Sequence, residues 1–93
     1  MTAKKFKQAV REFSKILRFD CDNPDARFYR GVCYLDWKKN TRAIEDLTKL
    51  IEKNPLHKKI AYIVLSIAYR RSNDYLGSLR TLSRGIMHFP KYA

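Results

Sequence analysis

The chain has 93 residues, which is enough for one small domain and too few for two independent hydrophobic cores. Hydrophobic residues make up 45% of it, and it has only three glycines and three prolines, which excludes a disordered, low-complexity or collagen-like chain. Lysine and arginine outnumber aspartate and glutamate by 20 to 9, so the formal net charge is +11 and an anionic partner is expected.

Apolar residues recur with the spacing of α-helices along the whole chain. From Phe6 to Leu17 they form one stripe, which stops at the polar run before Pro24. Residues 60–69 are rich in β-branched and aromatic types, which also suit a strand, but a single strand would have no partner. A helix is therefore expected there too. The later helices are predicted at 25–37, around 43–51, at 59–71 and at 75–88.

The predicted helices repeat along the sequence. Ala9 and Ala43 are 34 residues apart, and a further 35 residues lead to Ser78. The segments around these three positions have similar patterns of apolar and polar residues, and prolines at 55 and 90 close two of them. A period of about 34 residues with two helices per unit is typical of helical repeat proteins.

On these residues the chain resembles the tetratricopeptide repeat (TPR) family over nearly its whole length. The resemblance implies an all-α fold, a right-handed α-solenoid of antiparallel helix–turn–helix hairpins with five helices. It gives a single domain over 1–93, with the second helix of unit one at 4–20, unit two at 24–55 and unit three at 58–90. Because the first and last units lack neighbours, we expect a fragment of a longer array.

The TPR packing signature has small residues where two helices approach closely and larger residues between successive hairpins. The positions that match it here are Ala9, Gly31, Tyr34, Ala43, Leu47, Pro55, Ser66, Tyr69, Ser78, Leu82 and Pro90.

In this family the first helices of successive units line a concave groove that binds extended peptides or helices. Its basic end here would suit an apolar anchor followed by an acidic residue. As an alternative, the same apolar residues pack on neighbouring repeats or on a second copy. The corresponding positions are Phe28, Tyr29, Val32, Leu35, Ile60, Ile63, Ile67, Arg70 and Arg71.

No catalytic motif is present: the sequence has no Ser/His/Asp order, phosphate loop or paired carboxylates, and His57 and His88 stand apart from any carboxylate or thiol set. We therefore expect no enzyme, no cofactor and no metal site, but a non-catalytic protein–protein interaction scaffold. Two alternatives stay open. One is homotypic oligomerisation through the unfinished repeat ends, and the other is a basic repeat that binds RNA or another polyanion.

The sequence also predicts a compartment. The N-terminus lacks the apolar stretch of a signal peptide, and no apolar run reaches the length that spans a bilayer. The two cysteines, Cys21 and Cys33, match no zinc spacing and are expected to stay reduced. These features favour the cytoplasm, with a cytoskeletal or ciliary setting by analogy with other basic TPR scaffolds.

Overall fold

The computed structural model describes residues 2–90, which form five α-helices and no strand. This confirms the all-α prediction, including the helix over 60–69. Most helix starts are fixed by a side chain that caps the first turn; at α2, for example, Asn23 Oδ1 accepts a hydrogen bond of 2.9 Å from the Ala26 amide. The helices are α1 (Ala3–Phe19), α2 (Pro24–Asp36), α3 (Asn40–Lys53), α4 (Lys59–Arg71) and α5 (Tyr75–His88).

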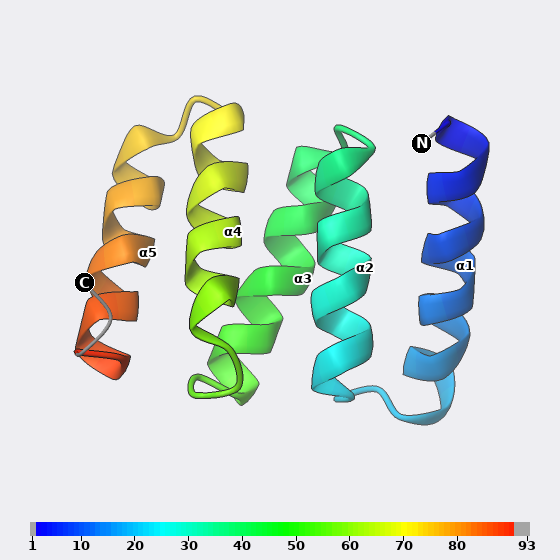
Figure 1. Cartoon of the computed structure of the whole chain (residues 1–93), viewed down its shortest axis with the longest axis horizontal. Helices are drawn as coiled ribbons and strands as arrows, with labels where there is room; N and C mark the ends of the chain where they lie inside the picture. Colours follow the sequence, from blue (N-terminus) through cyan, green and yellow to red (C-terminus); the bar gives the residue numbers. More distant parts are fainter. Residues whose placement is uncertain (1, 91–93) are drawn as a thin grey trace.

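Successive helices run antiparallel and stand side by side along the long axis of the molecule (Figure 1). Each helix packs on the next one in the chain, and α2 also contacts α4 across α3. Among the described residues, the terminal helices α1 and α5 each pack against one other helix only. The arrangement is therefore a row of helical hairpins.

The turns that close α2 and α4 have the same geometry. Lys38 and Asn73, which are 35 residues apart, both have φ of 63°, a left-handed conformation that ends a helix. In each turn two amides bond back to the last helical turn, as in a Schellman motif; the Lys39 amide bonds to the Tyr34 carbonyl and the Asp74 amide to the Tyr69 carbonyl, both at 2.8 Å. The two hairpins thus repeat one backbone pattern.

The main core lies between α2, α3 and α4. Its fully buried side chains include Leu47, Leu50 and Tyr62. Gly31 allows α2 and α3 to approach closely, because a Cβ atom at this position would lie 2.9 Å from Leu47 Cγ. Burying each of these large side chains stabilises the fold by about 1.5–3 kcal/mol.

An ion pair links the first three helices. The Arg30 guanidinium on α2 donates two hydrogen bonds to the Asp46 carboxylate on α3, at 2.7 and 2.6 Å, and a third to Ser14 Oγ on α1, at 3.1 Å. Hydrogen bonding to Asp46 outweighs the desolvation of Arg30 and raises the pKa of this guanidinium above its ordinary value. The Arg30 guanidinium therefore stays charged at all physiological pH values.

Candidate functional site

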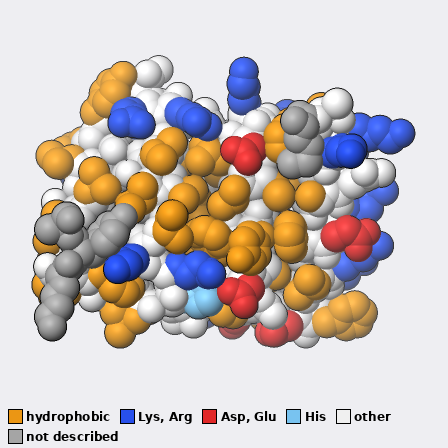
Figure 2. Space-filling model, viewed as in Figure 1, with side chains coloured by type: hydrophobic (Ala, Val, Ile, Leu, Met, Phe, Trp, Pro, Cys, Tyr) orange, Lys and Arg blue, Asp and Glu red, His pale blue; other side chains and the backbone are white. Residues whose placement is uncertain are grey.

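The predicted groove residues that remain accessible gather on one face formed by α2 and α4. We call this surface the α2/α4 face; it consists of Tyr29, Val32, Ile60, Ile63 and Ile67. Tyr29 is 45% exposed and Ile60 50% exposed, while the other three are half-buried. Figure 2 shows an apolar band across the molecule over these helices.

Two predicted groove residues lie inside the protein. Phe28 is 7% exposed and packs in the main core, and Leu35 is 5% exposed in a smaller cluster with Ala43 and Ala68. Their side chains are covered by the chain's own helices and are not available to a partner.

The basic end of the predicted groove lies at the last turn of α4. Arg70 and Arg71 are both exposed, and neither forms an ion pair with any residue of 2–90. The C-terminal end of a helix carries a partial negative charge that favours nearby cations. Because both side chains are exposed and unpaired within residues 2–90, an acidic group of a partner can approach them at this end of the α2/α4 face.

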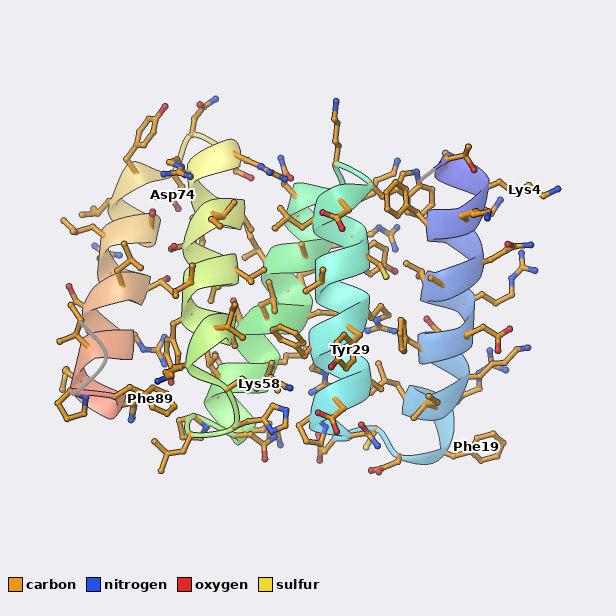
Figure 3. The ribbon with its side chains drawn as sticks, in the orientation of Figure 1. Lys4, Phe19, Tyr29, Lys58, Asp74 and Phe89 are labelled. Carbon is orange, nitrogen blue, oxygen red and sulfur yellow. The ribbon has the colours of Figure 1, made fainter. Side chains whose placement is uncertain are left out.

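The opposite end of the face carries aromatic rings and a lysine. The Tyr29 ring packs edge-on against Phe28, with centroids 5.3 Å apart, and stacks on Phe13 of α1 at 6.0 Å. Lys58 Nζ, just before α4, lies 5.4 Å from the Phe28 centroid and 5.7 Å from that of Tyr29 (Figure 3). These contacts hold α1, α2 and the start of α4 together and fix the Tyr29 side chain.

The prediction that His57 stands apart from carboxylates was wrong. Its Nε2 lies 3.0 Å from Asp25 Oδ1, although the two residues are 32 positions apart in sequence. The turn before α4 packs against the start of α2 and brings them together. Asp25 is well exposed, so this is a surface contact of small energetic weight.

The packing-signature residues lie mostly where helices meet. Ala43, Leu47, Gly31 and Ser66 are buried, and the Ser66 hydroxyl donates to the Ile63 carbonyl at 2.7 Å. Leu82 is exposed, because no described helix follows α5 to cover it. The half-buried members are Ala9, Tyr34, Pro55, Tyr69 and Ser78, and Pro90 is exposed.

The chemistry of the described residues is that of surfaces and packing. In residues 2–90 no group of three or more His, Cys, Asp or Glu side chains could hold a metal ion. Cys21 and Cys33 are both free thiols, and burial raises the pKa of the Cys33 thiol above its ordinary value. No described helix combines the length and apolar character needed to cross a membrane.

Sequence reasoning missed the Arg30–Asp46 pair, and the only signal for it was a charged residue within each apolar stripe.

Comparison with known proteins adds no assignment: no protein-family model matches the sequence, and the search of curated proteins finds no match.

Proposed function

We propose that this chain is a non-catalytic interaction module of TPR type that binds a peptide or helix of another protein on the α2/α4 face and serves as a scaffold in a larger assembly. The observation that carries the proposal is the face itself, in which accessible apolar side chains of two neighbouring helices adjoin Arg70 and Arg71. Contiguous apolar surface bordered by charge is typical of protein-binding sites.

Two features support the TPR assignment and, with it, a right-handed solenoid. The same turn geometry returns after 35 residues, at Lys38 and Asn73. Gly31 and Ser66 are buried where the helices of each hairpin are expected to approach closely. As part of this proposal the module works in the cytoplasm, where thiols such as those of Cys21 and Cys33 stay reduced.

The charge distribution indicates the chemistry of the partner. Over residues 59–93 there are six Lys and Arg residues and a single acidic residue, Asp74. A ligand with one or two apolar anchors followed by an acidic residue would fill the α2/α4 face and neutralise Arg70 and Arg71. Such complementarity raises both the specificity and the rate of association.

The test is selection of binding peptides from a random displayed library, followed by affinity measurement with two matched variants. Arg70→Glu with Arg71→Glu reverses the basic end of the α2/α4 face. Arg80→Glu with Arg84→Glu makes the same charge change on α5, outside this face. We expect acidic, apolar-anchored peptides whose affinity falls at least tenfold with the first variant and less than twofold with the second.

Equal losses in the two variants would show that binding follows net charge and not the α2/α4 face. Selection of peptides without acidic residues would likewise contradict the proposed partner chemistry.

Self-association is a second candidate, favoured by the outer face of α5. This helix exposes a row of apolar side chains, whereas its inward side packs on α4. Sedimentation over a wide range of protein concentration tests it: a monomer at every concentration excludes this candidate. The exposed row consists of Tyr75, Leu76, Leu79, Leu82, Ile86 and Met87.

A further inference from the structure

A hollow of about 360 Å³ lies between α1 and the turn that joins α2 to α3. It is separate from the α2/α4 face, and none of its lining residues belongs to that face. Its size is that of a site for one side chain or one small ligand. We call it the α1/α3 hollow.

Four cations line the α1/α3 hollow, and no acidic side chain does. Lys7 and Arg11 lie one turn apart on α1, while Lys39 and Arg42 flank the first residues of α3. None of the four forms an ion pair with a residue in the described range 2–90. Like charges at this spacing on a helix are destabilising. Their convergence from two distant segments indicates a site for an anion.

Two aromatic rings complete the lining. The rings of Tyr34 and Trp37 are nearly parallel, at 5°, with centroids 6.5 Å apart. Lys39 Nζ lies 5.1 Å from the Trp37 centroid, and Arg42 Cζ lies 5.9 Å from the Tyr34 centroid. The rings therefore hold two of the cations near the hollow and also offer apolar surface to a flat ligand.

We propose that the α1/α3 hollow binds an aryl phosphate monoester, namely a phosphotyrosine side chain of a partner protein. A phosphate monoester carries nearly two negative charges at pH 7 and several strong acceptor oxygens, which suits a site with four cations. The forked guanidinium groups of Arg11 and Arg42 match phosphate geometry, and the phenyl ring of the ligand packs on Tyr34 and Trp37.

A nucleic-acid strand fits the hollow less well. Non-specific binding of a strand uses a basic groove that follows the backbone over several nucleotides. Here exposed acidic residues stand close by on both helices: Glu12 follows Arg11 on α1, and Glu45 lies one turn after Arg42 on α3. An exposed row of cations does follow α1 through the hollow, so the case against a strand rests on these acidic neighbours and on the small volume of the hollow. The row consists of Lys4, Lys7, Arg11, Lys15 and Arg18.

The chain contains its own reporter for this site. Trp37 is its only tryptophan and lines the hollow, so its fluorescence responds to a ligand bound there. The probe is a short peptide with phosphotyrosine between glycines, compared with the same peptide carrying tyrosine or phosphoserine and with a uridine-rich RNA. We expect saturable change with the phosphotyrosine peptide, at least tenfold weaker binding of phosphoserine, and no response to unmodified tyrosine.

Two matched double variants locate the binding. Lys7→Gln with Arg11→Gln removes two cations of the hollow, while Arg80→Gln with Arg84→Gln removes two from α5 at the same four-residue spacing. All four side chains are exposed, so both proteins should keep the helical content of the parent. We expect the first variant to bind the phosphotyrosine peptide at least tenfold more weakly and the second within twofold.

Equal weakening in both variants would overturn the proposal, since binding would then follow net charge. Equal affinity for the tyrosine and phosphotyrosine peptides would also overturn it, as would tighter binding of the RNA than of the phosphotyrosine peptide.

Discussion

Replacing Asp46 with alanine would remove the acceptor of two charged hydrogen bonds from Arg30 and leave a guanidinium among three helices. The two bonds are 2.7 and 2.6 Å long, and the Asp46 side chain is 6% exposed. In the variant Arg30 would keep its bond to Ser14 Oγ but would have no anion beside it.

The cost follows from the burial of the two partners. Removing one member of a buried ion pair costs about 3–5 kcal/mol, because the remaining charge stays without compensation. The Arg30 side chain is 22% exposed, so water can solvate part of it and the cost should lie near or somewhat below the lower end of that range. We expect Asp46→Ala to lower the free energy of unfolding by about 2–4 kcal/mol, a large share of the stability of a small domain.

Urea unfolding followed by circular dichroism measures this loss, and a double-mutant cycle shows its source. In Arg30→Met with Asp46→Ala neither charge remains, so the double variant should be more stable than Asp46→Ala alone. A loss below about 0.5 kcal/mol in Asp46→Ala, or strictly additive losses in the double variant, would refute the reasoning, since the pair would then carry no coupling energy.

Three further predictions concern the turns and the close contacts. Lys39 has nearly the same backbone angles as Asp74 (φ −94°, ψ 68° against −96°, 79°), but only the Asp74 side chain caps the helix that follows it. Lys39→Asp should therefore add a cap to α3 and raise the free energy of unfolding, measured in urea, by about 1 kcal/mol. An unchanged free energy of unfolding would contradict this prediction. Gly31→Ala should lower the free energy of unfolding by about 1–2 kcal/mol, because the added methyl group would lie too close to Leu47 in the core. An unchanged free energy of unfolding would mean that Leu47 can move aside without loss of packing, which contradicts the prediction. Iodoacetamide at neutral pH should modify the exposed Cys21 before Cys33, because Cys33 is half-buried and burial raises the pKa of its thiol, which lowers the fraction of reactive thiolate. Equal rates by mass spectrometry would exclude this order.

The helices could be predicted from the sequence because apolar residues recur in each of them with helical spacing. The prediction of a helix over 60–69 is confirmed, although the composition of this segment also suits a strand. Contacts between different helices are not revealed by any regular spacing of residues in the sequence. The Arg30–Asp46 pair joins residues 16 positions apart, and a charged residue within an apolar stripe does not indicate which residue pairs with it. The predicted groove shows the same limit: periodicity placed Phe28 on the apolar side of its helix but could not tell that neighbouring helices cover it.

The row-like packing of the helices has a consequence for local opening. A helix with one neighbour loses fewer contacts when it detaches than a helix with two, so α1 and α5 should fray more often than the central helices and exchange their amide hydrogens faster. The α2/α4 face lies on central helices and persists through such events, although Tyr29 loses its stacking on Phe13 when α1 detaches. The α1/α3 hollow loses two of its four cations whenever α1 detaches. A ligand in the hollow would therefore slow hydrogen exchange in α1, whereas a ligand on the α2/α4 face would leave the exchange of α5 nearly unchanged.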